Sequence, residues 1–255
     1  MAEAFLHAWR NTLRTARSGR LAILFAALVL AVTATGSVGV FTERVRAALE
    51  QQSGDALGGD ALLRGRDPLA AEALAAVQAA GVATTPVVTF ASVAAAGERT
   101  TLVSVKAVGE GYPRRGQLKL AREAFGAMQP ADGIPPRGEA WVDGRLLADL
   151  ALPLDGSFQL GQLTLKASAL VAYEPDRSGG FTDLAPRVMI HIDDLAASGL
   201  LSVGSRASYA LQLTGSREAL AAAEALPRAS NTRWLTPKEG RPEVKNTLDR
   251  AGQFL

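Results

Sequence analysis

Residues 21–41 read LAILFAALVLAVTATGSVGVF, a run of 21 residues without one charged side chain. A helix of this length, at about 1.5 Å per residue, covers the roughly 30 Å hydrocarbon core of a bilayer. Arg10, Arg14, Arg17 and Arg20 precede the run, and basic residues favour the cytoplasmic side of a span. Residues 21–41 therefore predict a transmembrane helix, with the N-terminus in the cytoplasm and residues 42–255 outside it.

Two other interpretations of this run stay open. It could be the apolar region of a cleaved signal peptide, with residues 32–34 as the cleavage site, although it is longer than such regions usually are. It could also be a buried helix of a soluble protein, which is disfavoured because the run is apolar on every face. Residues 1–20 predict a cytoplasmic basic amphipathic segment, which either lies on the anionic leaflet or simply flanks the span.

Charge and composition exclude several classes of function. The chain has 27 Lys and Arg against 25 Asp and Glu, and residues 21–255 hold 23 and 24 once the four arginines and Glu3 of residues 1–20 are left out. The outward part therefore lacks the basic field that nucleic-acid binding requires, and we expect no nucleic-acid partner. The absence of cysteine excludes disulfides and thiol chemistry.

Two strand-helix-strand patterns organise the outward part. The first has strands at 60–64 and 82–93, a helix expected to start at Asp67 and Pro68, and a returning strand at 101–108. The second has strands at 206–213 and 232–235 around a helix capped by Ser216. Together they predict an α+β fold, in which residues 42–108 and 202–240 form a ferredoxin-like split βαβ subdomain.

The remaining residues predict an inserted unit and a cut-off helix. Residues 109–201 predict an inserted β-rich subdomain, with strands at 140–143, 157–160, 163–173 and 187–192. Residues 241–255 predict a helix that leads to a second span missing from this chain. We expect a fragment or a truncated gene product.

Catalytic, cofactor-binding and metal-binding residues are all predicted to be absent, and no cofactor is expected. Histidine occurs only at His7 and His191, and neither G-x-S-x-G nor G-x-x-x-x-G-K-[ST] is present. His191 alternates with isoleucines and is interpreted as structural, and Asp193 and Asp194 as a helix N-cap. The loops at 111–116 and 174–181 combine charge, glycine and an aromatic residue, so each is either a contact loop or a solvated turn.

Several stretches, in this order, carry a family resemblance. They are residues 41–45, residues 57–60, residues 103–108 with 111–113, residues 174–181 with 184–188, and the helix that starts at residues 241–243. Taken together, these stretches resemble the FtsX/MacB-like ABC transporter permeases, and among them the YbbP-like permeases. The resemblance covers nearly the whole chain.

The resemblance implies a non-catalytic permease subunit of the bacterial inner membrane with a MacB-like periplasmic domain. It implies an ABC ATPase subunit, a second permease copy or half, the lipid bilayer and a periplasmic partner as its partners. ATP-driven motion would then be coupled to export or extraction of a lipid-like or other substrate. The chain lacks the family's later spans, and the extracytoplasmic sensor or binding domain of a membrane receptor remains the alternative.

Overall fold

The computed structural model describes residues 20–123, 126–177, 184–201 and 205–237. The chain divides into two units, Met1–Leu49 and Glu50–Leu255. The amphipathic segment expected within residues 1–20 and the helix expected at 241–255 lie outside the described residues, except for Arg20.

Helix α2 (Arg20–Leu57) carries the predicted span. Its segment Ile23–Val45 has a mean hydropathy of 2.2 and is not buried against the rest of the protein. In the described part of the chain it is the one helix that is long and apolar enough to cross a membrane. The hydroxyls of Thr35, Ser37 and Thr42 donate to backbone carbonyls four residues earlier, which satisfies these polar groups within the helix.

Helix α2 continues beyond Phe41 and ends at Leu57, within the second unit. Gly58 follows with a φ of +73°, a left-handed conformation that favours glycine at a helix end. The helix therefore ends directly before two glycines, Gly58 and Gly59.

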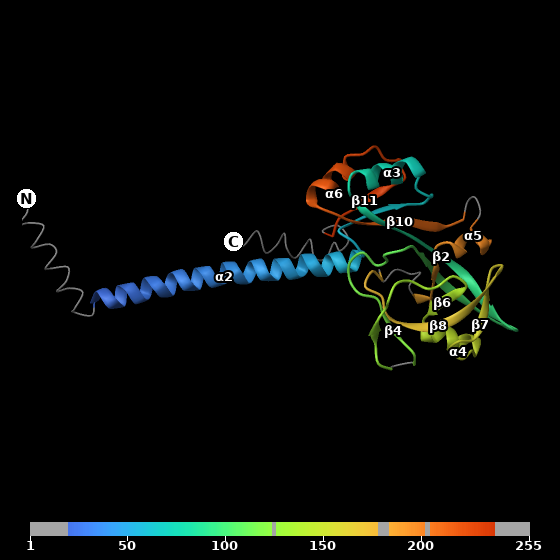
Figure 1. Cartoon of the computed structure of the whole chain (residues 1–255). Helices are drawn as coiled ribbons and strands as arrows, with labels where there is room; N and C mark the ends of the chain where they lie inside the picture. Colours follow the sequence, from blue (N-terminus) through green and yellow to red (C-terminus); the bar gives the residue numbers. More distant parts are fainter. Residues whose placement is uncertain (1–19, 124–125, 178–183, 202–204, 238–255) are drawn as a thin grey trace, which may run out of the picture. The chain divides into compact units, whose positions relative to one another are not determined.

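Four strands and two helices form one part of the second unit. The chain order is β1 (Ala61–Gly65), α3 (Ala71–Ala79), β2 (Ala83–Ala96), then β10 (Ala207–Thr214), α6 (Arg217–Glu224) and β11 (Arg233–Leu235). In space the strand order is β11-β1-β10-β2, and every neighbouring pair is antiparallel. Helices α3 and α6 lie together on one face of these strands (Figure 1), where Val77 and Ala223 pack against Leu63, Leu211 and Leu213.

The two helix starts predicted from capping residues have different outcomes. Ser216 caps α6 as expected, because its Oγ accepts a hydrogen bond from the backbone N–H of Ala219 at 3.1 Å. The start predicted at Asp67 and Pro68 is wrong, since α3 begins at Ala71 without a side-chain cap. The carboxylate of Asp67 instead accepts a hydrogen bond from Asn231.

Six strands close into a ring in the other part of the unit. Around the ring they are β2, β3 (Arg99–Val108), β9 (Arg187–His191), β6 (Glu139–Val142), β8 (Leu163–Tyr173) and β7 (Ser157–Leu160). Pairing of Ala94 with Leu160 joins β7 back to β2. Apolar side chains fill the interior, among them Phe90, Val105, Phe158, Leu165 and Ile190. Helix α4 (Gly144–Leu150) adds Leu146 and Leu150 to the same core.

The strands predicted between residues 109 and 201 lie close to their expected positions, but they do not form a sheet of their own. Strands β9 and β7 pair with β3 and β2, so the predicted insertion shares one sheet with the strands around it. The short strands β4 (Lys119–Ala121) and β5 (Gln129–Pro130) extend this sheet beyond β8. A further short helix, α5 (Asp194–Ala197), follows β9. The subdomain boundaries read from the sequence stay a prediction.

Candidate functional site

A buried lysine lies at the centre of the site. Strand β3 alternates between two faces: Val103, Val105 and Ala107 point into the core of the ring, so Ser104 and Lys106 point to its outside. The side chain of Lys106 is only 5% exposed. A charged group this deeply buried is costly unless oppositely charged groups and hydrogen bonds surround it.

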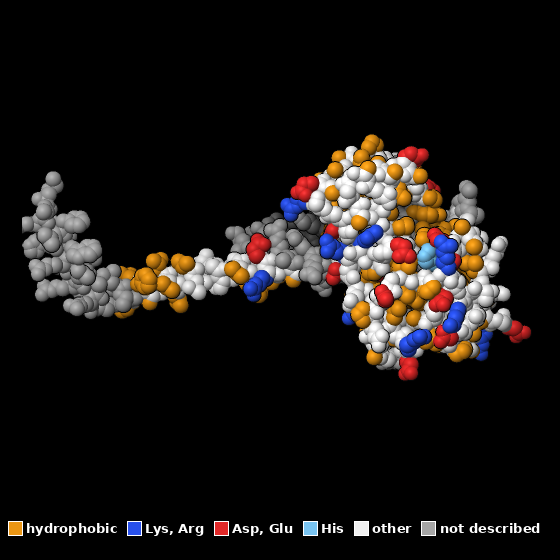
Figure 2. Space-filling model, viewed as in Figure 1, with side chains coloured by type: hydrophobic (Ala, Val, Ile, Leu, Met, Phe, Trp, Pro, Cys, Tyr) orange, Lys and Arg blue, Asp and Glu red, His pale blue; other side chains and the backbone are white. Residues whose placement is uncertain are grey.

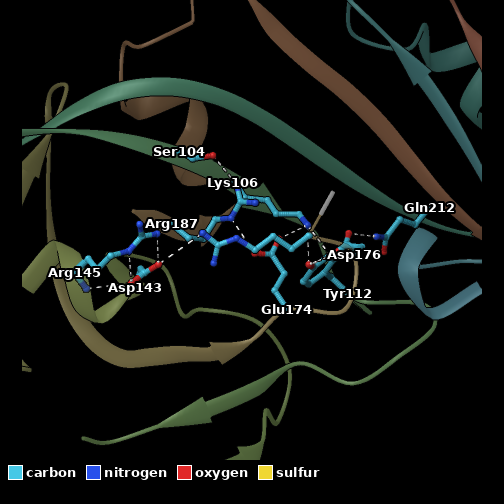
Figure 3. A network of polar contacts seen from close by, with 10 residues as sticks. Ser104, Lys106, Tyr112, Asp143, Arg145, Glu174, Asp176, Arg187 and Gln212 are labelled. Atoms are coloured by element: carbon cyan, nitrogen blue, oxygen red, sulfur yellow. Dashed lines mark hydrogen bonds and ion pairs between the residues drawn. The ribbon is translucent and has the colours of Figure 1, made fainter. Parts of the chain in front are cut away.

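Two carboxylates and a phenol hydroxyl surround this ammonium group (Figure 3). Lys106 Nζ lies 2.7 Å from Glu174 Oε1 and 2.7 Å from Asp176 Oδ1. It also donates to the hydroxyl of Tyr112 at 2.8 Å, and that hydroxyl donates to Asp176 Oδ1 at 2.5 Å. The ammonium group can donate three hydrogen bonds, and all three are used here.

A second cation shares Glu174. Arg187, at the start of β9, lies beside Ser104 in the parallel pair of β3 and β9. Its Nε donates to Glu174 Oε2 at 2.9 Å and its Nη1 to Ser104 Oγ at 2.6 Å. Each oxygen of Glu174 therefore accepts from a different cation. Two buried cations face two carboxylates, so the formal charge of the cluster is balanced.

The cluster also reaches β10 and the end of α2. Gln212 Nε2 donates to Asp176 Oδ2 at 2.8 Å, and its Oε1 accepts from the backbone N–H of Arg114 at 3.3 Å. Gly58 lies directly against this amide, because a Cβ on Gly58 would fall 2.1 Å from Gln212 Nε2. We call Lys106, Tyr112, Glu174, Asp176, Arg187 and Gln212 the buried network.

A second contact ties the same region together. The backbone N–H of Arg115 donates to the carbonyl of Gly58 at 3.1 Å. The guanidinium group of Arg115 makes two bonds to Asp60, at 2.8 and 3.1 Å. The turn after α2 is therefore held by the loop that also supplies Tyr112.

Burial and charge shift two pKa values in the network. Burial alone would raise the pKa of Glu174, but Lys106 and Arg187 outweigh it and hold that pKa below its ordinary value. Burial, together with the carboxylates of Asp176 and Glu174, raises the pKa of Tyr112 well above its ordinary value. Glu174 therefore stays ionised and Tyr112 stays protonated near neutral pH, which suits a fixed structural joint and not proton transfer.

Stretches singled out in the sequence meet at this network. Residues 57–60, 103–108 and 111–113 contribute Gly58, Lys106 and Tyr112, and residues 174–181 and 184–188 contribute the carboxylates and Arg187. Of the two loops whose role was open, each buries a side chain, Tyr112 in one and Glu174 in the other. Neither loop is therefore a wholly solvated turn, because each makes contacts inside the domain. A contact of either loop with another molecule stays a prediction, and residues 178–181 lie outside the described part.

Sequence reasoning missed the pairing itself. Lys106 and Glu174 are 68 residues apart, and nothing in a single sequence links them. One signal for it was present in the sequence. Lys106 is the single charged residue in the run 103–108, whose other residues are apolar or small, and a cation inside a buried strand requires a partner.

His191 and Asp193, which the sequence also singled out, are not part of the buried network. His191 is near the end of β9, and its Nδ1 accepts from the backbone N–H of Asp193 at 3.1 Å. Asp193 precedes α5 but makes no side-chain cap, so the capping interpretation is wrong for its side chain, which pairs with Arg137 instead. Within the described ranges, no group of three or more His, Cys, Asp or Glu residues could hold a metal ion.

Comparison with known proteins gives one curated relative. No protein-family model matches the chain. The chain is 29% identical over 242 residues, 94% of its length, to a protein of Escherichia coli (strain K12) named as the uncharacterized ABC transporter permease YbbP. The predicted resemblance to ABC transporter permeases is confirmed. The chain spans 29% of the length of that permease.

Two solved structures of transporter domains are distantly similar. One is the extracellular domain of the noncanonic ABC-type transporter YknZ from Gram-positive bacteria, with a TM-score of 0.45, 10% identity, and coverage of 69% of this chain and 100% of that one. The other is the periplasmic region of MacB from Actinobacillus actinomycetemcomitans, with a TM-score of 0.47, 10% identity, and coverage of 77% and 95%.

Proposed function

We propose that this chain is the membrane-anchored periplasmic part of an ABC transporter permease, in which helix α2 crosses the inner membrane. The observation that carries the proposal is the similarity to the permease YbbP over 94% of the chain, which includes the apolar helix. The basic residues before that helix favour a cytoplasmic N-terminus and a periplasmic second unit. A separate ATPase subunit would hydrolyse ATP, and this chain would have no catalytic role.

We also propose a ferredoxin-like split unit whose halves are separated by residues 109–201. Its elements are β1, α3, β2, β10, α6 and β11. The strand order β11-β1-β10-β2, antiparallel throughout, supports this assignment, because it is the order of the split βαβ motif.

In this proposal the buried network is the joint at which movement enters the periplasmic unit. The turn after α2 is where the chain leaving the predicted span enters the domain, and Gly58 lies against Gln212 there. Gln212 bonds to Asp176, and Asp176 pairs with Lys106 of the ring. A push or pull at this turn would reach both parts of the unit through short, fixed contacts. The substrate would be lipid-like or otherwise taken from the membrane or periplasm.

The absence of cysteine permits a clean test of the topology. Single cysteines are introduced as Glu98→Cys, in the exposed turn after β2, and as Thr15→Cys, before the predicted span. A membrane-impermeant maleimide added to spheroplasts should label Glu98→Cys at once and Thr15→Cys only after the membrane is permeabilised. Equal labelling of both positions, or recovery of the chain in the soluble fraction, would overturn the proposal.

A further inference from the structure

A basic groove lies on the sheet face opposite α3 and α6. Leu63 and Leu211 point toward those helices, so Arg64, between Leu63 and Gly65 on β1, points to the other face. Arg66 and Arg206, beyond the ends of β1 and β10, line the same groove. Arg233 on β11 lines it as well, and the groove has a volume of about 940 Å³.

None of these four arginines forms an ion pair with an acidic residue in the described ranges. Asp67 is the single acid among the lining residues, and its carboxylate is engaged by Asn231. The chain apart from residues 1–20 is almost balanced in charge, so four arginines on one groove are a local excess of positive charge.

The register of the strands makes this excess costly. Arg64 and Arg233 stand directly opposite each other in the antiparallel pair of β1 and β11. Like charges in directly opposed positions destabilise a strand pair. The two side chains are exposed, so the repulsion is tolerated, but folding gains nothing from it. An anion between the two guanidinium groups would turn this repulsion into two attractive contacts.

Hydroxyl donors lie on the same face of the sheet. Ser208 on β10 and Thr89 on β2 are direct cross-strand partners and both line the groove. Guanidinium groups bind phosphate through paired N–H donors, and hydroxyl groups add further donors. This donor set is rich in positive charge and poor in carboxylates, which suits a phosphate-type anion carrying more than one negative charge.

We infer that this groove binds a phosphate-bearing anion, either the headgroup of a phospholipid or a free phosphate compound. The inference goes beyond the proposed function and does not require that the chain work in a transporter. The arginines of the groove bind the anion, and the hydroxyls orient it.

The test titrates the full chain in a nonionic detergent with pyrophosphate, by calorimetry at low salt. The decisive variant is Arg64→Gln/Arg233→Gln, and the matched control is Arg99→Gln, an exposed arginine at the start of β3, outside the groove. Wild type and control should bind at one saturable site. The double variant should bind about a hundredfold more weakly, since each lost charge-assisted contact is worth about tenfold.

Two further measurements keep the result clear. Because the opposed charges repel each other, the double variant should melt at the same temperature as wild type or higher. Pyrophosphate should raise the melting temperatures of wild type and of the control, but not that of the double variant. If the double variant does not fold, Arg206→Gln replaces it, since Arg206 lies outside the strand pairing. Absence of saturable binding to wild type, or equal binding by the groove variant, overturns the inference. Equal binding would assign the anion to the arginines of residues 1–20.

The source of the phosphate is resolved by a second pair of ligands. Dihexanoyl phosphatidic acid and dihexanoyl phosphatidylcholine are titrated below their micelle concentrations. Tighter binding of the phosphatidic acid than of pyrophosphate, with no binding of the phosphatidylcholine, identifies a lipid headgroup. Binding of phosphatidic acid no tighter than that of pyrophosphate identifies a free phosphate compound. Binding of the phosphatidylcholine as tightly as the phosphatidic acid would show apolar contact in place of anion recognition and would overturn the inference.

Discussion

Lys106 shows how one side chain can decide whether the second unit holds together. It lies between Glu174, Asp176 and Tyr112, and its charge compensates two carboxylates that are themselves buried. Removal of one partner from a buried ion pair is far more damaging than replacement of the whole pair, because a desolvated charge is left behind.

We therefore predict that Lys106→Met lowers the free energy of unfolding by about 3–5 kcal/mol. The matched control is Lys166→Met, which removes an exposed lysine paired with Asp155 at 2.8 Å and should produce no measurable change. Guanidinium unfolding of the full chain in detergent, followed by tryptophan fluorescence, measures both. Equal stability of the two variants would show that the network does not hold the domain together.

Glu174 should make the stability of the domain depend on acid pH. The nearby cations hold its pKa in the folded state below the value of the unfolded chain. The stabilisation is therefore present above the unfolded value of about 4.3 and is lost as the pH falls through the lower folded value. Unfolding free energies measured between neutral pH and the acid limb should fall less steeply for Glu174→Gln than for wild type. Glu98→Gln, in an exposed turn, should keep the wild-type slope.

At the scale of elements, the turn after α2 is a tightly constrained connection. Gly58 has a φ of +73° and no room for a side chain beside Gln212. Gly97, between β2 and β3, has a φ of +58° but open space around it. The two glycines thus share a backbone conformation and differ in what surrounds them.

Alanine substitutions at these two glycines separate the cost of backbone strain from the cost of the contact with Gln212. Gly97→Ala should cost about 1–2 kcal/mol, the usual penalty of a left-handed conformation for a residue with a Cβ. Gly58→Ala should cost clearly more, because its methyl group displaces Gln212 from Asp176. The difference between the two unfolding free energies measures how tightly the turn and the network are joined. Equal costs would mean that Gln212 moves aside freely.

The strands were largely predictable from the sequence, since alternation of apolar residues reports local structure. Strands β7 and β8 have the predicted bounds. Helix α4 was missed: Asp143 was assigned to a strand, whereas its carboxylate caps the helix by accepting from the backbone N–H of Arg145. Which strands pair could not be predicted, because β3 joins β9 across some 80 intervening residues and alternation does not choose between partners.

At the scale of the whole molecule, the part of the chain after residue 20 has no dominant sign of charge, since residues 21–255 hold 23 basic and 24 acidic side chains. Side chains of both signs are scattered on the face seen in Figure 2, without a large field of one sign. Attachment to a partner would then depend on local features such as the groove or the network, and not on overall attraction.

The permease resemblance leads us to expect further spans in a longer version of the protein. We predict that this longer version co-purifies with an ATPase subunit from membranes solubilised in mild detergent. Mass spectrometry of the eluate identifies the partner. The control is residues 1–255 prepared in the same way, which should not retain the ATPase if the further spans carry its contacts. Recovery of a signalling kinase in place of an ATPase would favour a membrane receptor.

The closed ring limits how another protein could attach to the second unit. Closure of β7 onto β2 removes two open edges, and the hydrogen-bonded path through the described strands ends at β11 and β5, which have three and two residues. Such short ends offer almost no template on which another chain could add a strand. Neighbouring copies of this chain are thereby kept from fusing their sheets, and a partner must recognise side chains and loops.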